Sequence, residues 1–443
     1  MNDRHYIYYS DTKKKNIRKK KNKRNFIYLI IFILSFICVS ILLVIIFSDN
    51  SNNIQSIDMV EKKITLEEPR EISSITIGAT GDILIHMPVL DAFWSEEGYD
   101  FTPAFSYIKE YYEKPDLMIA NLEVPLVDPN DGYNYSSNPF ASPDSIAIAL
   151  KNAGVDLCLT ANNHSYDMGN YGLIRTQNIL NQLGIDYIGT RYNWENSYVM
   201  VKTINEIKIG MTCFTYDTSA ETNGRKSLNY NILEENDSSL VNSFNYSNLE
   251  LFYNEAELQI KEMEDLNCDI KIFFLHWGEE YMDEPNHYQV EIAQKLCELG
   301  VDILIGGHPH VIQRFDTLNS SSGHQLLCLY SMGNALSNQR REYMNEDFYR
   351  GYTEDGLIIY LTIRKFNNGK TKIGCIEILP TWVEKRDSYR IIPLDYTKEP
   401  NDWKTFNTDS AIESYNRTIS RLGDNYILYR LEHHEEEIPL VLP

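Results

Sequence analysis

Cysteine is sparse in this 443-residue chain, and none of its seven cysteines belongs to a C-x-x-C pair. Cysteines scattered singly give no support for a disulfide framework, although they do not exclude individual bridges. Cys158, Cys213, Cys328 and Cys375 lie within apolar runs typical of buried strands. We therefore expect these four to be small core residues. The sequence also shows no internal repeat.

Positive charge is scarce beyond residue 48. Residues 1–48 carry ten Lys or Arg against two Asp or Glu, which leaves a net charge of −30 on the rest of a chain whose total is −22. A nucleic-acid-binding surface needs a basic footprint for the phosphates, so this composition predicts no nucleic-acid partner. The same negative field should repel other polyanions at long range.

One apolar stretch is long enough to cross a membrane. Phe26–Phe47 contains 22 residues without a charge, and at about 1.5 Å per residue it matches a hydrocarbon layer roughly 30 Å thick. A cleaved secretory signal is the main alternative, but its apolar part is about 7 to 15 residues long and ends at a small-residue cleavage site, which is missing here. A basic run precedes the stretch: Lys13, Lys14, Lys15, Arg18, Lys19, Lys20, Lys21, Lys23 and Arg24.

That basic run predicts the topology, because positively charged flanks stay in the cytoplasm. A nucleic-acid-binding arm is the alternative interpretation, which the adjoining apolar stretch disfavours. We therefore predict a single-pass protein of the cell membrane, with a basic cytoplasmic segment over 1–25 and a transmembrane helix over 26–47. A polar tether follows over 48–72, then an extracytoplasmic domain over 73–385 and a C-terminal extension over 386–443.

The domain alternates short β-branched apolar runs with amphipathic segments, which predicts a layered α/β protein. Helices are expected at 103–113, 143–153, 171–183, 249–266 and 288–299. Several of them end on a glycine suited to a left-handed cap, as at Gly154, Gly184 and Gly300. The polar segment 221–247 is predicted to be a surface insertion. Strands are expected at 75–79, 117–120, 155–160, 187–189, 207–215, 270–275, 301–305, 325–331, 357–364 and 372–379.

Metal-capable side chains fall close to the carboxyl ends of these predicted strands. Such ends of a mainly parallel sheet converge on one crevice, so we expect the side chains to meet there. Carboxylates, an amide oxygen and imidazoles suit a divalent transition ion such as Mn, Zn or Fe, and two ions bridged by one carboxylate would clamp a phosphoryl group. The residues are Asp82, Glu123, Asn163, His164, His276, His308 and His310.

Around these residues the sequence resembles the CapA family of bacterial poly-γ-glutamate capsule synthesis proteins. The ordered motifs are G-D-I-L at 81–84, N-L-E-V-P at 121–125, A-N-N-H-S-Y-D-M-G at 161–169, H-W-G-E-E-Y at 276–281, G-G-H-P-H-V at 306–311 and Y-S-M-G-N at 330–334. The family is similar to calcineurin-like metallophosphoesterases, so the resemblance implies a four-layer α/β/β/α metallo-dependent phosphatase-like sandwich. It also implies polyglutamate synthetase or export subunits as partners.

The resemblance assigns a role to each matching residue. Asp82 and His310 would ligate a first ion, Glu123 would bridge, and Asn163, His276 and His308 would hold a second. His164 would act as a catalytic acid or donor, with Asp167 as its partner. Glu280 would orient a ligand or the substrate, and Asn334 would contact substrate or cap a turn. The sequence departs from the superfamily in two places: Ile83 and Leu84 follow Asp82 where Asp-x-His is usual, and a glutamate replaces the bridging aspartate at 123.

Each motif alone has a plainer interpretation. Asp82 could cap a turn, Asn163 and His164 could be a hydrogen-bonded loop pair, and His308 with His310 could form a turn around Pro309. Three functions therefore stay open: a membrane-anchored subunit for making or exporting a polyglutamate capsule or related envelope polymer, a general metal-dependent phosphoesterase or amide hydrolase, and a metal-free binding scaffold.

Overall fold

The computed structural model describes residues 69–129, 133, 140–344, 352–385, 389–396, 408–423 and 426–428, all within one unit, Glu68–Pro443. The predicted cytoplasmic segment, the predicted transmembrane helix at 26–47 and most of the predicted tether lie outside these residues. Among the described helices, none is both long and apolar enough to span a bilayer. The first strand, β1, starts at Glu71, within the last residues predicted as tether.

The first sheet has nine strands, of which seven run in the order β19-β18-β17-β1-β4-β5-β6; β16 also pairs with β1, and β20 with β18. β1, β4, β5 and β6 are mutually parallel, whereas β17, β18 and β19 add as an antiparallel extension. The bounds are β1 Glu71–Ile83, β4 Leu117–Leu122, β5 Leu157–Leu159, β6 Asp186–Ile188, β16 Asn334–Leu336, β17 Asp355–Phe366, β18 Thr371–Lys385, β19 Tyr389–Pro393 and β20 Ile427–Leu428.

The second sheet has seven strands, six of them in the order β11-β8-β12-β13-β15-β14, with β7 paired to β8. Its centre, β8-β12-β13-β15, is parallel, while β7 and β14 are antiparallel to their neighbours. β7 and β14 thus form antiparallel additions beside a parallel centre. The bounds are β7 Met200–Ile204, β8 Ile207–Tyr216, β11 Ser243–Phe244, β12 Ile270–His276, β13 Ile303–Gly307, β14 Phe315–Asn319 and β15 Gln325–Leu329.

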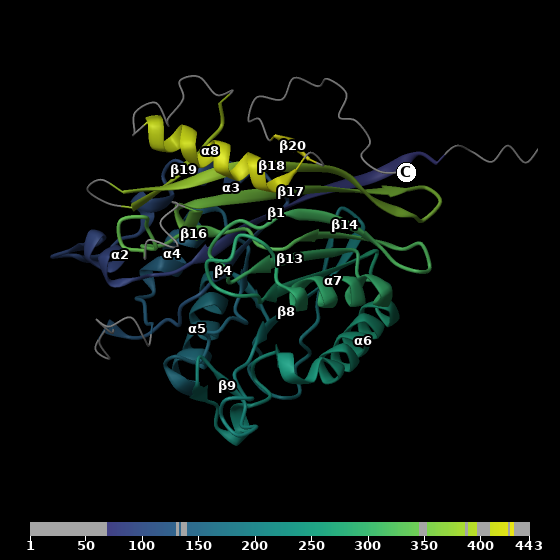
Figure 1. Ribbon diagram of the computed structural model, residues 1–443, viewed down its shortest axis with the longest axis horizontal. Helices are drawn as coiled ribbons and strands as arrows, with labels where there is room; N and C mark the ends of the chain where they lie inside the picture. Colours follow the sequence, from purple (N-terminus) through teal and green to yellow (C-terminus); the bar gives the residue numbers. More distant parts are fainter. Residues whose placement is uncertain are drawn as a thin grey trace, which may run out of the picture. The chain divides into compact units, whose positions relative to one another are not determined.

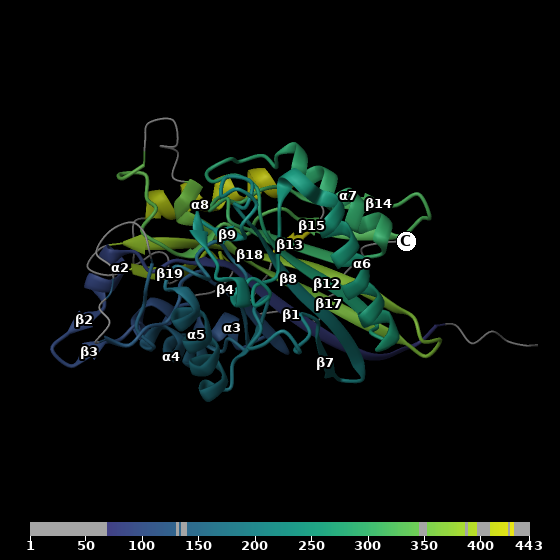
Figure 2. The ribbon, with the colours of Figure 1, turned by 90° about the horizontal axis from the view of Figure 1, so that it is seen from below.

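The two sheets pack face to face, and helices cover their outer faces. Side chains alternate along each strand, so Ile272 and Phe274 of β12 enter the core between the sheets, whereas Phe273 and Leu275 meet the helices outside. α4 (Ser145–Ala153) and α5 (Gly169–Leu183) cover the first sheet, and α6 (Leu249–Asp265) and α7 (His287–Leu299) cover the second (Figures 1 and 2). The predicted mixed α/β class is confirmed, and its layers run helix, sheet, sheet, helix.

The C-terminal region adds another helix to the first sheet. α8 (Thr408–Leu422) lies over β18 and β19 in Figure 1, and its Ala411 packs with Trp382 and Ile392. Arg417 of α8 forms a bidentate ion pair with Asp355 at the start of β17, at 2.6 and 2.7 Å. This part of the predicted extension is therefore packed against the sheet.

Two local predictions differ from the structure. The helix expected at 103–113 is divided into a 3-10 turn, η1 (Thr102–Phe105), and the short α3 (Lys109–Tyr112). The segment 221–247 is more than a surface insertion, because its Leu228 and Val241 are fully buried. The remaining elements are α2 Met87–Ala92, β2 Trp94–Ser95, β3 Gly98–Tyr99, β9 Ser227–Leu228, β10 Asn231–Ile232, η3 Glu235–Asp237, η4 Tyr246–Asn248 and η6 Tyr352–Glu354.

Candidate metal centre

The six predicted metal ligands meet where both sheets present the carboxyl ends of their parallel strands. Asp82 is the penultimate residue of β1 and Glu123 directly follows β4, both in the first sheet. His276 ends β12, in the second sheet. Asn163 follows β5, and His308 and His310 follow β13. All six are buried, with exposed fractions between 0% and 3%.

Two overlapping groups of these side chains have the spacing of a metal site. Asp82, Glu123 and His276 form one, and Glu123, His308 and His310 form the other; in each, one ligand atom per residue lies within 4.8 Å of the others. Glu123 is common to both groups. A carboxylate in that position could bridge two ions, which is the role that the resemblance implies for it.

Lone-pair atoms converge on His276. Its Nε2 lies 2.7 Å from Oδ1 of Asn163 and 3.2 Å from Oε1 of Glu123. The Glu123 Oε1 atom is buried and has no hydrogen-bond donor within the described structure. The buried Nδ1 of His308 likewise has no partner there. Because leaving such atoms buried and unsatisfied costs about 1 to 3 kcal/mol each, a cation that accepts both lone pairs fits the site.

The ring of His310 is oriented by contacts at one of its nitrogens. Its Nδ1 lies between two acceptors, Oδ2 of Asp82 at 3.3 Å and Oδ1 of Asn334 at 3.2 Å. Nδ1 therefore carries a proton, and Nε2 lies 4.0 Å from Oε1 of Glu123. Metal-ligating histidines are held in this way, with the second ring nitrogen donating to an oxygen. Asn334 itself donates to the carbonyl oxygens of His310 and Thr353, so the structure places it behind the ring.

Asp82 is held by backbone and amide donors. Its Oδ2 accepts from the backbone N–H of His308 at 3.0 Å, and its Oδ1 accepts from Nδ2 of Asn121 at 2.7 Å. Gly307 permits the close approach, because a Cβ there would lie only 2.7 Å from Oδ1 of Asp82. Asn121 also contacts Oε2 of Glu123 at 3.3 Å, so one amide group orients both carboxylates.

The pKa values of the titratable groups in this cluster are shifted in different directions. Burial opposes protonation of His310, but the Glu123 carboxylate and the hydrogen bond to Asp82 raise its pKa to about 9. Burial, reinforced by His276 and His310, holds the pKa of His308 well below its usual range. Burial works against ionisation of Asp82, yet the hydrogen bond from His310 and the charge of His276 bring the pKa of that carboxyl below its ordinary value.

His164 is hydrogen-bonded to the carboxylate of Asp167. Nδ1 of His164 lies 2.8 Å from Oδ2 of Asp167, and since a carboxylate only accepts, Nδ1 carries the proton. The ring packs edge-on against Phe140, with centroids 4.4 Å apart. Oδ1 of Asn229 accepts from Nδ2 of Asn163 at 3.1 Å, and Nδ2 of Asn229 lies 3.4 Å from Nδ1 of His164. The predicted pairing of His164 with Asp167 is thus present in the geometry.

A cavity of about 270 Å³ opens onto His164 and His310. Glu280 and Tyr281 line it, and so does Leu84, which occupies the position where the superfamily pattern has a histidine. Sequence reasoning missed several further lining residues: His86, Phe140, Asn229, Tyr230 and Gln339. The sequence gives little indication that these residues line a site, because they lie outside the motifs that carry the family resemblance.

Backbone strain is concentrated around the same cavity. His308, His310, Tyr281 and Tyr230 have positive φ angles of 95°, 57°, 67° and 64°. Side-chain-bearing residues adopt this region rarely, and such conformations cluster at functional sites where the surrounding structure enforces them. The observation supports a functional role for this end of the sheets.

With this geometry established, the comparisons with known proteins identify the family. Residues 76–339, well over half of the chain, match the family described as "Bacterial capsule synthesis protein PGA_cap". The chain belongs to this family, which is the CapA resemblance seen in the motifs. It is 26% identical over 280 residues to "Capsule biosynthesis protein CapA" of Bacillus anthracis, covering 61% of each chain. It is also 24% identical over 339 residues to "PGA biosynthesis protein CapA" of Bacillus subtilis (strain 168), covering 73% of this chain and 78% of the relative.

The chain thus spans about three fifths of the length of the Bacillus anthracis relative. Among solved structures it is similar to the NAD nucleotidase of Haemophilus influenzae, with a TM-score of 0.41 and 10% identity over 81% of this chain and 58% of that one. Membership of the PGA_cap family is shown by the sequence matches.

Proposed function

We propose that this PGA_cap family member is a metal-dependent hydrolase with a phosphatase-like site, anchored in the cell membrane through residues 26–47 and acting outside the cell on a capsule or related envelope polymer. The observation that carries the proposal is the pair of buried, unpartnered atoms, Oε1 of Glu123 and Nδ1 of His308, inside a cluster of carboxylates and imidazoles. Glu123 and His308 both belong to one of the two groups with metal-site spacing, so one divalent cation could be held by both residues.

One or two divalent ions would be held by Asp82, Glu123, Asn163, His276, His308 and His310. The mixture of oxygen and imidazole ligands suits Mn, Zn or Fe. Such an ion supplies Lewis-acid polarisation of a phosphoryl or carbonyl oxygen. The buried surroundings of Glu123 and His310 would strengthen every electrostatic interaction made there, because the local dielectric constant is low.

The chain's own residues would carry the proton transfer. Asp167 fixes the His164 ring and keeps a proton on its Nδ1, so the opposite nitrogen is the one available to a substrate in the cavity of about 270 Å³. As an imidazolium, with protons on both ring nitrogens, His164 would give the Nε2 proton to the leaving group as a general acid and keep the Nδ1 proton in its hydrogen bond to Asp167. Phe140 packs on one edge of that ring and would limit the approach of bulk water. Glu280 and Tyr281, which line the same cavity, would position the substrate.

Two related functions share this site. A phosphoesterase and an amide hydrolase would use the same ligands, since both reactions develop negative charge on an oxygen. A role in making or exporting a capsule polymer without turnover would need the fold but no chemistry, and partner subunits would then supply the reaction. The two Bacillus relatives are a capsule biosynthesis protein and a PGA biosynthesis protein, which favours a capsule polymer.

Metal content and turnover of the purified full-length chain in detergent test the proposal. We expect stoichiometric Mn, Zn or Fe by elemental analysis and metal-dependent hydrolysis of bis-p-nitrophenyl phosphate. Glu123→Gln should lose both. Glu257→Gln, which changes an exposed carboxylate on α6, should keep both. Absence of metal after reconstitution would overturn the hydrolase proposal, and bound metal without turnover on phosphoester or amide substrates would favour the binding role.

The proposed topology needs a separate test. Protoplasts, whose cell wall is removed but whose membrane is intact, can be treated with protease. The protease should digest the domain over 73–385 and leave a membrane-bound fragment containing residues 1–47. A domain that resists protease until the membrane is opened would contradict the extracytoplasmic location, whatever the outcome at the metal centre.

A further inference from the structure

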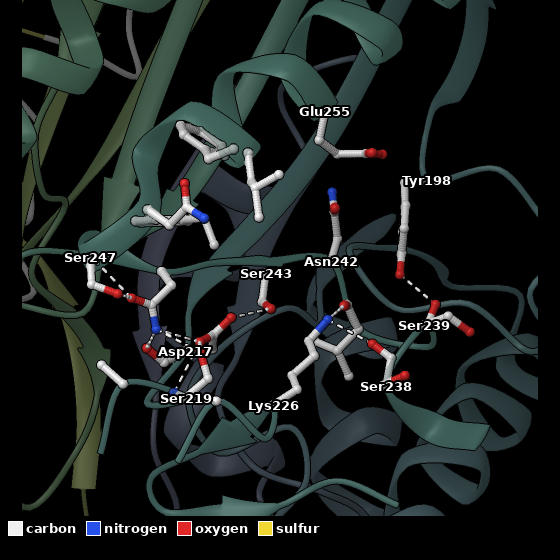
Figure 3. Close-up of a pocket in the computed structure, with 18 of the residues that line it drawn as sticks. Tyr198, Asp217, Ser219, Lys226, Ser238, Ser239, Asn242, Ser243, Ser247 and Glu255 are labelled. Atoms are coloured by element: carbon white, nitrogen blue, oxygen red, sulfur yellow. Dashed lines mark hydrogen bonds between the residues drawn. The ribbon is translucent and has the colours of Figure 1, made fainter. Parts of the chain in front are cut away.

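A second cavity lies away from the metal centre. It measures about 780 Å³, and its walls come from the segment 217–248, from α6, and from Arg191 and Tyr198. Figure 3 shows Lys226 extending between the hydrogen-bonded group around Asp217 and the Tyr198–Ser239 pair, with Glu255 on the far side. The lining is rich in hydroxyl and amide groups: Ser219, Ser238, Ser239, Ser243, Ser247, Asn242, Asn245 and Asn248.

Two cations of this cavity have no carboxylate partner within ion-pair distance among the described residues. Nζ of Lys226 donates to the carbonyl oxygens of Ser238 and Val241, at 2.7 and 2.6 Å. Nε of Arg191 donates to the carbonyl oxygen of Ser239 at 2.6 Å. Both cations therefore reach the same short loop, and the positive charge of Arg191 acts on Lys226.

This arrangement contrasts with other arginines of the domain. Arg175 pairs with Asp144, Arg314 with Glu284 and Asp316, and Arg341 with Glu354 and Glu413. In a region with a net charge of −30, carboxylates are plentiful. Lys226 and Arg191 differ from these three arginines in having no carboxylate partner among the described residues.

The carboxylates that do line the cavity are engaged elsewhere. Asp217 accepts from the backbone N–H and hydroxyl of Ser219, the hydroxyl of Ser243 and the amide of Asn245. Glu255 accepts from Nε2 of Gln259 at 3.0 Å. Burial accordingly lowers the pKa of Lys226 to about 8, although Asp217 and Glu255 act in the opposite direction.

We propose that this cavity binds a small molecule bearing an oxyanion, either a carboxylate or a phosphate, with the anion placed between Lys226 and Arg191. Partly desolvated cations gain from an anionic ligand because each charged hydrogen bond is stronger than a neutral one. The hydroxyl and amide groups around them would bind the polar remainder of the ligand. The site is independent of the proposed metal centre, so either proposal can fail alone.

Calorimetric titration of the full-length, EDTA-treated chain in detergent tests this site. Inorganic phosphate and succinate are the two probes, titrated separately at constant ionic strength because long-range charge effects depend on salt. We expect saturable binding of at least one probe, and the stronger probe indicates whether the natural ligand carries phosphate or carboxylate. Lys226→Met and Arg191→Met should each weaken that binding at least tenfold, whereas Lys226→Arg should retain most of it.

Three controls separate this result from other causes. Lys208→Met removes a half-buried lysine that also donates to a backbone carbonyl, that of Leu266, but outside the cavity, and it should leave binding unchanged. Glu123→Gln should leave binding unchanged as well, because it alters only the metal centre. Thermal unfolding must show that each variant is folded. Saturation by neither probe, or equal weakening in Lys208→Met, would overturn the assignment.

Discussion

Nε2 of His276 lies 3.2 Å from Oε1 of Glu123, although the two residues belong to different sheets. Glu123 follows β4 of the first sheet and His276 ends β12 of the second. Between them the sheets are joined by an apolar core. A cation bound by Glu123 and His276 would therefore link the two sheets. Among the described residues, groups of side chains with the spacing of a metal site occur only here.

The first prediction concerns stability and metal. A cation that binds the folded chain and not the unfolded one should stabilise it by about 2.7 kcal/mol at a hundredfold excess over Kd. Differential scanning calorimetry of the EDTA-treated chain should thus show a Tm that rises as Mn or Zn is added. Glu123→Gln should abolish the rise. A Tm in the wild-type chain that does not respond to any of the proposed ions would count against the site.

The second prediction identifies individual ligands. His310→Ala and Glu123→Ala should each lower metal occupancy, because both side chains belong to the group that surrounds the unpartnered Nδ1 of His308. His287→Ala and Glu257→Ala are matched controls that remove an exposed imidazole and an exposed carboxylate. Elemental analysis after dialysis measures the difference, and unchanged stoichiometry in the first pair would show that the ligands are misassigned.

The sequence predicted much of this site because the relevant signals are local. Apolar runs that end in Glu123 or His276 reveal both the strand and the position of its last side chain, so convergence follows from strand direction. Asn121 was not predicted to belong to the site, although it is the first residue of the N-L-E-V-P motif at 121–125. Its only signal was a polar side chain at the end of the apolar run of β4, and its two carboxylate partners come from the folded arrangement.

Other features could not be predicted from local patterns. The break between η1 and α3 depends on how residues 102–112 pack beneath α4 and the first sheet, with Tyr111 and Tyr112 fully buried. The large cavity is formed by segments that look polar and irregular in sequence, and its two cations have no carboxylate partner among the described residues. Long-range packing determines both features, whereas hydrophobic periodicity reports only local structure.

The third prediction concerns the support of His164. Asp167→Asn keeps the size of the side chain but replaces a carboxylate that holds the proton on His164 Nδ1. We expect a fall in kcat on phosphoester substrate, of at least tenfold, with unchanged metal content, because the ring loses its fixed orientation. His164→Ala should lower kcat at least as much. The double variant should be no worse than His164→Ala alone if Asp167 acts through the ring, and an additional loss would contradict that role.

The fourth prediction tests whether the close backbone approach at Gly307 is required. A Cβ at this position would meet Oδ1 of Asp82 at 2.7 Å, and Asp82 is fixed by Asn121 and by the backbone N–H of His308. Gly307→Ala should therefore displace Asp82, lower metal occupancy and destabilise the chain by about 1 to 3 kcal/mol.

Gly374→Ala is the matched control for that change. Its Cβ would also meet a side chain, with the nearest atom 2.5 Å away, but that atom is the Nε of Arg364, near the flexible end of a half-buried side chain. The arginine can move aside, so stability and metal content should stay close to those of the wild-type chain. Because both substitutions add one methyl group to a strand glycine, a difference between them isolates the constraint on Asp82. Equal metal content in the two variants would mean that Asp82 has room to retreat and that the approach of Gly307 is not needed for binding.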